Sequence, residues 1–231
     1  MRKRIWQKQS AGWLALILLI VGLAGCQGGA GAPTAVNQPA PTMAQPADTA
    51  EATAVDLAIT PAQAEGPFYP ITAPPDRDSD LTTVPGSDQT AAGQILWLNG
   101  RVLYQNGAPA AGAVVEIWQT DDQGIYMHPG DAGTANRDPN FQFFGEAVAG
   151  ADGSYAFKTI VPGLYEPRPR HIHFKVKVGG QTVLTSQFYF AGFDGLSGGE
   201  FPEPLVLTAV PGTDEAGQAI LTAQKDIVLS G

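Results

Sequence analysis

The chain has 231 residues and 44% of them are hydrophobic, which is enough for one ordinary domain with an apolar core plus a non-globular extension. Acidic residues outnumber basic ones by 22 to 13. This balance makes nucleic acid and anionic lipid surfaces poor partners. The simplest explanation of the acidity is solubility.

Residues 1–25 have the layout of a secretory signal peptide. Arg2, Lys3 and Arg4 precede an apolar stretch from Gly12 to Ala24, which is too short for a comfortable transmembrane helix. The stretch ends in small residues before Cys26, the only cysteine, and so resembles a bacterial lipobox. We expect cleavage before Cys26, acylation of its thiol and an exported lipoprotein anchored on the extracytoplasmic side of a bacterial membrane. An uncleaved anchor, or a signal peptide with a chance cysteine, is the alternative.

Residues 26–55 are rich in Gly, Ala, Pro, Thr and Gln and carry almost no charge, so they cannot bury enough surface to fold. We expect a flexible linker that holds a domain at 56–231 clear of the membrane. Losing the four basic residues of the signal leaves 9 basic against 22 acidic residues, a net charge of −13. With its cysteine lipidated, the mature protein has no thiol left for a disulfide.

Beyond the linker, short runs of Val, Ile, Phe and Tyr alternate with turn residues such as Asn106-Gly107 and Gly179-Gly180. This pattern predicts an all-β fold, an antiparallel β-sandwich with long functional loops and little helix. At most, Asp214 to Thr222 forms one or two helical turns. The predicted strands are Ile95 to Tyr104, Val114 to Gln119, Ser154 to Ile160, His171 to Val178, Thr182 to Phe190 and Asp226 to Leu229.

Two predicted connections are long for a compact domain, Gly66 to Gly93 and Thr120 to Phe141. Long connections without secondary structure tend to carry function. The first is rich in Asp, Ser, Thr and Pro, so simple disorder is its alternative interpretation.

Two of the three histidines lie in one predicted strand, as His171-Ile172-His173. Alternate residues of a strand point the same way, so the two imidazoles face one side and can share a metal ion. Alone this pattern is weak, because such histidines are often ordinary surface or core residues.

Further candidates precede the histidine pair. Tyr165 and Arg168 stand in a proline-rich segment that leads into it, and Tyr126 follows an earlier strand. Two phenolates and two imidazoles suit a trivalent cation such as Fe(III), and the lack of a free thiol disfavours metals that prefer thiolates. The alternative is that both tyrosines are sandwich residues whose hydroxyls bond to backbone.

The motifs occur in a distinctive order: Gly124-Ile125-Tyr126, Pro162-Gly163-Leu164-Tyr165, Arg168 with the histidine pair, and Gln187 before an aromatic run. In this order they resemble the intradiol ring-cleavage dioxygenases, the family of the protocatechuate and catechol dioxygenases. The resemblance covers about Glu65 to Asp194.

The resemblance implies a non-haem Fe(III) site. Tyr126 would be the equatorial and Tyr165 the axial tyrosinate, with His171 and His173 as the remaining protein ligands. The catalytic residues would be Arg168 beside the substrate ring, Gln187 orienting substrate or oxygen, and Tyr165, which the substrate displaces.

The implied partners are a small-molecule catechol and O2, and the implied product is a cis,cis-muconate-type dicarboxylate. Family members are oligomeric, but a short tethered version could be monomeric, so the assembly stays open. The role of His128 also stays open, between a pocket residue and a solvated one. The rival hypotheses are a non-enzymatic cell-surface β-sandwich that binds a ligand, and a zinc or copper site on the same histidines.

Overall fold

The computed structural model describes residues 56–194 and 198–231. Strand β1 (Ile95–Tyr104) shows the alternation that the sequence predicts, because successive side chains of a strand point to opposite faces. Leu96, Leu98 and Val102 are fully buried, whereas Trp97 between them is 38% exposed. One face of this strand therefore builds the core and the other faces solvent.

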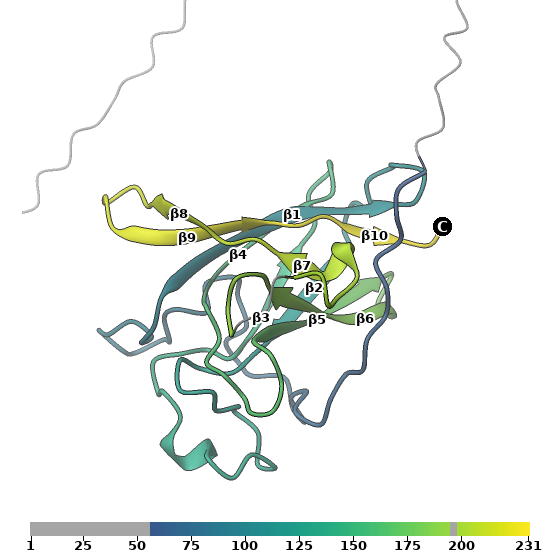
Figure 1. Cartoon of the computed structure of the whole chain (residues 1–231). Coiled ribbons are helices and arrows are strands. Elements are labelled where there is room, and N and C mark those ends of the chain that lie inside the picture. The colour runs from purple at the N-terminus through teal and green to yellow at the C-terminus, as the bar shows by residue number, and fades with distance from the viewer. Residues whose placement is uncertain (1–55, 195–197) are drawn as a thin grey trace, which may run out of the picture. The chain divides into compact units, whose positions relative to one another are not determined.

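The named strands form two five-stranded sheets, which lie as two layers with the apolar core between them (Figure 1). The first sheet contains β1, β4 (Ser154–Ile160), β8 (Val210–Thr213), β9 (Ala219–Gln224) and β10 (Ile227–Leu229). The second contains β3 (Phe144–Val148), β2 (Val114–Trp118), β5 (His171–Val178), β6 (Gln181–Phe190) and β7 (Val206–Leu207), in that order. The described helices are two short 3-10 turns, Thr134–Asn136 and Glu203–Leu205.

The predicted all-β sandwich with little helix is confirmed. Its sheets are mixed, since β9 and β10 pair parallel with β1, and β7 pairs parallel with β6, while the other named pairs are antiparallel. Parallel pairing needs a long connection in place of a tight hairpin, and the C-terminal part of the chain provides it by returning to β1.

Each of the six predicted strands is present, within about two residues of its predicted ends. The prediction of helical turns between Asp214 and Thr222 is wrong, because this segment is the hairpin that joins β8 to β9. The Asp214 carboxylate accepts the backbone N–H groups of Ala216 and Gln218, at 2.9 and 2.8 Å. Asp214 therefore closes a turn, because its carboxylate satisfies backbone N–H groups that a helix would otherwise pair.

Strand β5 divides its side chains between the core and the opposite face of the second sheet. Ile172 and Phe174 are fully buried in the core, where the Phe174 ring stacks on Phe188 of β6 with centroids 4.2 Å apart. His171 and His173 alternate with them and point away from the core, yet they too are buried, at 5% and 4% exposed. The outer face of this sheet must therefore be covered.

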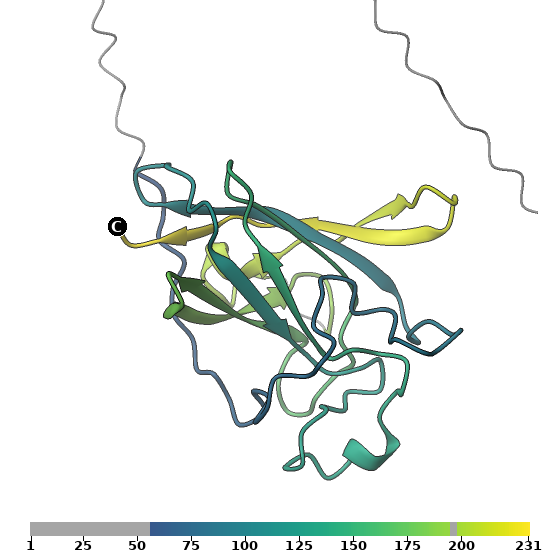
Figure 2. The same ribbon diagram turned by 180° about the vertical axis from the view of Figure 1, so that it is seen from behind.

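The cover is an extended segment, residues 57–70, which we call the strap. Its backbone bonds to β10 through Thr60 and to β6 through Gln63, and the Ser186 hydroxyl donates to the carbonyl of Pro61. Figures 1 and 2 show the blue strap descending along one edge of the sandwich, from β10 past β6, and the teal loop 119–143 on the side of the second sheet that faces away from the first. Two segments distant in sequence thus enclose the outer face that carries the histidines.

Shortening Ile172 to valine is expected to lower the free energy of unfolding by about 0.5–1.5 kcal/mol, because a buried methylene is lost from the core. Metal content is expected to stay unchanged, since this side chain points away from the histidines. Urea titration measures the first and metal analysis the second. Val183→Ala is the matched control, because Val183 is 51% exposed and its truncation is expected to change little. Equal stability of the two variants would contradict the packing.

The predicted signal peptide 1–25, Cys26 and the linker 26–55 lie outside the described residues. Within residues 56–194 and 198–231, the chain has no helix with the length and apolar character needed to cross a membrane.

Candidate metal centre

The two histidines of β5 bring their ring nitrogens together. The Nε2 atoms of His171 and His173 are 3.0 Å apart, and the rings lie nearly perpendicular with centroids 4.6 Å apart. The Nδ1 atom of His171 is 2.7 Å from the carbonyl of Pro169. A carbonyl only accepts hydrogen bonds, so Nδ1 carries the proton and Nε2 presents a lone pair. That tautomer is the one a metal ligand needs.

Tyr126 reaches this pair, and Tyr165 packs against Tyr126. The Tyr126 hydroxyl is 3.1 Å from Nε2 of His171, and the side chain is 3% exposed. Tyr165 presents its edge to the ring of Tyr126, with centroids 5.5 Å apart. Phe68 of the strap packs against both rings, at 4.8 and 5.5 Å. The four residues predicted as ligands therefore form one cluster, roofed by an aromatic ring of the strap.

Two glycines explain how the tyrosine loops approach each other. Gly124 and Gly163 each stand two residues before a tyrosine. A Cβ on Gly124 would lie 2.2 Å from the carbonyl oxygen of Leu164, and a Cβ on Gly163 would lie 2.2 Å from the backbone nitrogen of Gly124. Any side chain at either position would push the loops apart, so glycine is required for close backbone contact.

The loop that carries Tyr126 has no strand pairing, and two buried aspartates fix its shape through hydrogen bonds to its backbone. Asp131 accepts the backbone N–H groups of Tyr126 and Gly133, at 2.9 and 2.7 Å. Asp121 is fully buried, and one of its oxygens accepts the N–H groups of Gln123 and Ile125. Because these bonds satisfy backbone groups that no strand pairs, the loop keeps a fixed shape and so fixes the direction of Tyr126.

The protonation states favour a cation at this cluster. Burial lowers the pKa of His171 to about 4 and that of His173 to about 2, with the Arg168 charge contributing in each case, so both rings are neutral near pH 7. Burial also raises the pKa of Tyr126, while Arg168 acts in the opposite direction. A buried phenolate needs a strong positive partner, and a trivalent ion bonded to its oxygen supplies one.

The environment of His173 fits a ligand in a closed shell. Its ring stacks on Trp118 of β2, with centroids 4.7 Å apart and planes 8° apart. On the other side, a Cβ added to Gly66 of the strap would lie 3.3 Å from its ring. Its Nδ1 is buried without a hydrogen-bond partner among the described residues. The ring is thus held by packing. Its Nε2, which faces Nε2 of His171, remains in position to bind a metal ion.

The donor set decides which ion fits. The described residues contain no group of three or more His, Cys, Asp or Glu side chains that could hold a metal. The oxygen donor beside the two imidazoles is the phenol of Tyr126, and Tyr165 stays the predicted fourth ligand. Hard anionic oxygen donors with nitrogen donors match a ferric ion. The residues present fit the predicted Fe(III).

Arg168 and Gln187 lie together beside the cluster. Gln187 stands directly opposite His173 in the pairing of β5 with β6. Its Oε1 accepts a hydrogen bond from Nη2 of Arg168 at 3.0 Å, and its Nε2 donates to the carbonyl of Ala64 in the strap at 2.6 Å. Both ends of the amide thus already have protein partners. The predicted role of Gln187 in orienting substrate or oxygen stays a prediction.

His128 lies at the margin of the cluster. Its ring is 5.5 Å from Phe68, and its Nδ1 accepts the backbone N–H of Gly130 at 3.0 Å. It thus closes a local turn, and the residues with which it interacts do not include the four candidate ligands.

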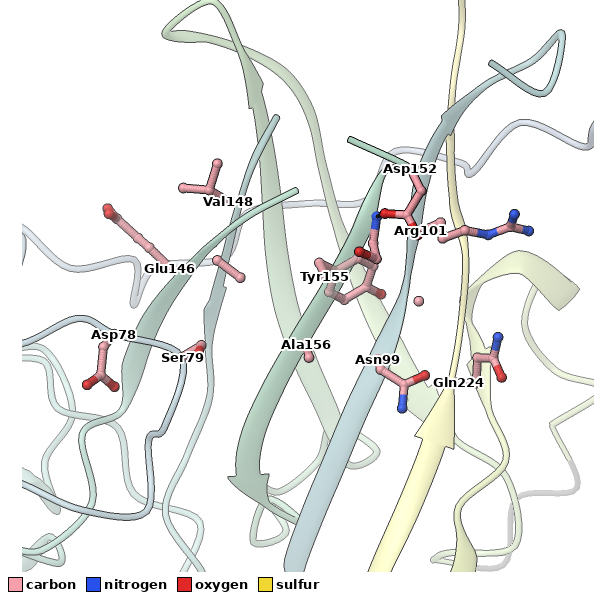
Figure 3. A pocket seen from close by; sticks show the side chains of 13 residues that line it. Asp78, Ser79, Asn99, Arg101, Glu146, Val148, Asp152, Tyr155, Ala156 and Gln224 are labelled. Atoms are coloured by element: carbon pink, nitrogen blue, oxygen red, sulfur yellow. Dashed lines mark hydrogen bonds between the residues drawn. The ribbon is translucent and has the colours of Figure 1, made fainter. Parts of the chain in front are cut away.

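Two cavities are relevant to the location of a substrate. The larger, about 700 Å³, lies against the first sheet, where Figure 3 shows Asn99, Arg101 and Gln224 on one side and Glu146 on the other. It contains none of the predicted site residues. A second cavity, of about 350 Å³, is lined by Pro167, Arg168 and Phe201 among others. Arg168 is the predicted site residue that lines this smaller cavity, and none of the four candidate ligands lines it.

The chain resembles known proteins in sequence and in fold. A model of the dioxygenase family matches residues 64–210, more than half of the chain and all of the cluster. The chain belongs to this dioxygenase family. Among solved structures, the dioxygenase domain of a dioxygenase and carbohydrate-binding protein fusion from Streptomyces sp. SirexAA-E is 32% identical with a TM-score of 0.58. That similarity covers 75% of this chain and 99% of that domain.

Curated dioxygenases match over a shorter part of their length. The beta chain of protocatechuate 3,4-dioxygenase from Burkholderia cepacia is 38% identical over 124 residues, which are 50% of this chain and 52% of that protein. Catechol 1,2-dioxygenase 1 from Acinetobacter lwoffii is 33% identical over 152 residues, 58% of this chain and 47% of that protein. The chain thus spans about half the length of the curated dioxygenases that it matches.

Several residues that shape this dioxygenase site were not predicted. Phe68 and Ala64 belong to a segment whose course over the sheet no local pattern reveals. Asp131 resembled an ordinary loop residue, and Tyr189, which lies against Gln187, resembled a strand residue. Only the glycines carried a signal, because each precedes its tyrosine by two residues.

Proposed function

We propose that this protein is a non-haem Fe(III)-dependent dioxygenase that opens the ring of a catechol between its two hydroxyl-bearing carbons. Both atoms of O2 enter the product, a cis,cis-muconate-type dicarboxylate, so no external reductant is required. The observation that carries the proposal is the approach of three donor atoms. The Tyr126 hydroxyl lies 3.1 Å from Nε2 of His171, which lies 3.0 Å from Nε2 of His173. Membership of the dioxygenase family supports it.

The iron would be held by Tyr126, Tyr165, His171 and His173. When bound, it supplies Lewis-acid chemistry, drawing electron density from a chelated catecholate so that the ring reacts with O2. A neutral catechol must lose two protons to bind in this way, and the phenolate oxygen of Tyr165, whose ring packs against that of Tyr126, would accept one of them. The second proton would pass to hydroxide or water from the solvent that the catechol displaces.

The remaining residues control charge and water. Arg168 places a fixed positive charge beside the cluster, where it stabilises negative charge that develops on the substrate ring. Phe68 closes the strap side of the site against Tyr126 and Tyr165. A catechol is small enough for the cavity of about 350 Å³ beside Arg168. Arg168 is exposed in this structure, so a bound catechol that covers it would strengthen its effect by lowering the local dielectric.

Oxygen uptake by the iron-loaded protein tests the proposal. Catechol, protocatechuate and hydroxyquinol are supplied in turn, and consumption of O2 is compared with the product identified by mass spectrometry. The expected result is one O2 consumed per ring opened with at least one of the three, and a product that contains both oxygen atoms. No uptake with any of them, or a protein that binds zinc or copper in preference to iron, would reject the enzyme and favour the binding module or the other metal site.

We also propose that the mature protein is tethered through Cys26 on the extracytoplasmic side of the membrane. The lipobox-like sequence before Cys26 and the polar spacer after it support this proposal. Cys26→Ala is expected to move the protein from the membrane fraction to the soluble fraction, which cell fractionation measures. Gln27→Ala keeps the cysteine and serves as control. Retention of Cys26→Ala in the membrane fraction would contradict the anchor.

A further inference from the structure

The amide of Gln187 has a fixed orientation. Its Nε2 donates to the carbonyl of Ala64 at 2.6 Å, and a carbonyl accepts only, so the nitrogen must face the strap. Its Oε1 therefore faces the opposite way, where it accepts from Arg168 at 3.0 Å and from the Tyr189 hydroxyl at 3.2 Å. One side-chain oxygen thus joins the arginine to a tyrosine to which the sequence had assigned no role.

Tyr189 is held rigidly. It stands two residues beyond Gln187 on β6, directly opposite His171, and is 3% exposed. Its ring stacks on Phe201, with centroids 3.8 Å apart and planes 5° apart. Its hydroxyl donates to Oε1 of Gln187 at 3.2 Å. A rigid ring with a protonated hydroxyl fixes the position of the oxygen to which it donates.

Arg168 needs such a restraint. Arg168 lies in a surface turn and is exposed to solvent. An exposed arginine side chain can adopt many rotamers. The Oε1 of Gln187 accepts from Nη2, so the position of the guanidinium follows the position of that oxygen.

We propose that Tyr189 is a positioning residue of the dioxygenase reaction, whose hydroxyl holds the Gln187 side-chain oxygen and thereby keeps Arg168 beside the metal cluster. The inference rests on the proposed function. It assigns Gln187 the same indirect role, because its amide connects the strap and Tyr189 to the arginine. In this role Tyr189 needs no contact with the substrate or the reacting atoms.

Tyr189→Phe tests the inference, because it removes the hydroxyl and keeps the ring that stacks on Phe201. The expected result is a fall in kcat of about 5- to 10-fold, the range that one lost hydrogen bond produces. KM, iron content and the thermal midpoint are expected to stay close to wild type. Tyr155→Phe is the matched control, since Tyr155 is also a buried tyrosine but its hydroxyl donates to the carbonyl of Lys225 at 2.7 Å, in the first sheet. Its kcat is expected to match wild type.

A double-mutant cycle separates positioning from a general effect. In the Arg168→Ala background, Tyr189→Phe is expected to lower kcat no further, because there is no guanidinium to position. Losses that multiply would overturn the inference, and so would an unchanged kcat in the single variant. If wild type turns over no catechol, the proposed function fails, and the inference is then tested through the reaction of Arg168 with phenylglyoxal. Mass spectrometry is expected to find a faster reaction in Tyr189→Phe, and an equal rate in the two proteins would overturn the inference.

Discussion

Replacing His173 with alanine is expected to remove the bound iron and to lower ring cleavage by more than about 10³-fold. The Nε2 of His173 is 3.0 Å from that of His171, so its loss removes one of four candidate donors from the cluster. Residues that merely support a metal ligand typically contribute 10- to 100-fold in metal affinity, and a ligand is expected to contribute more. Metal analysis measures the iron, and oxygen uptake with a catechol measures turnover.

Two comparisons make the His173 result specific. His173→Gln keeps most of the side-chain volume against Trp118, so a similar loss of iron in this variant separates the missing imidazole from a cavity. His128→Ala removes a nearby histidine that closes a local turn and is expected to keep its iron. A His173→Ala protein that holds iron and turns over at the wild-type rate would exclude this residue as a ligand.

Arg168→Ala is expected to keep its iron and to lose about 10²- to 10³-fold in kcat/KM, the usual effect of removing a group that stabilises transition-state charge. The side chain lies beside the metal cluster and is not one of its four candidate donors, so metal binding and catalysis should separate here. Stopped-flow or oxygen-electrode kinetics give the rate, and metal analysis gives the iron content.

The matched control is Arg101→Ala. Arg101 pairs with Asp226 at 3.0 Å on the first sheet, far from the cluster in sequence and on the other layer. Its removal lowers the positive charge of the protein by the same amount, and kcat/KM is expected to be unchanged. If both arginine variants slow equally, the effect is one of overall charge and Arg168 has no special part in the reaction.

Local patterns in the sequence were sufficient to predict the central strands. In β5, His171 and His173 alternate with Ile172 and Phe174, and a period of two identifies a strand with two different faces. The same period placed both imidazoles on one side. The histidine pair could therefore be anticipated from spacing, whereas the ligand roles of the two tyrosines came from the resemblance to the dioxygenase family.

Non-local contacts were beyond such patterns. The parallel pairing of β9 and β10 with β1 joins residues more than 100 positions apart, and no local signal identifies the partner of such a strand. The orientation of the Gln187 amide depends on a carbonyl more than 100 residues away. The turn at Asp214 was misassigned because its hydrogen bonds also occur at the start of helices.

The strap means that the first residues of the domain contribute more to the site than to the core. Progressive trimming from the amino end would remove the Ala64 carbonyl, then the surface that Gly66 offers to His173, then the Phe68 roof, before it reached any strand of either sheet. A domain shortened to about residue 75 would therefore keep every named strand and still lack the cover over the proposed metal cluster. Foldedness alone would be a misleading criterion for choosing where an active fragment of this protein begins.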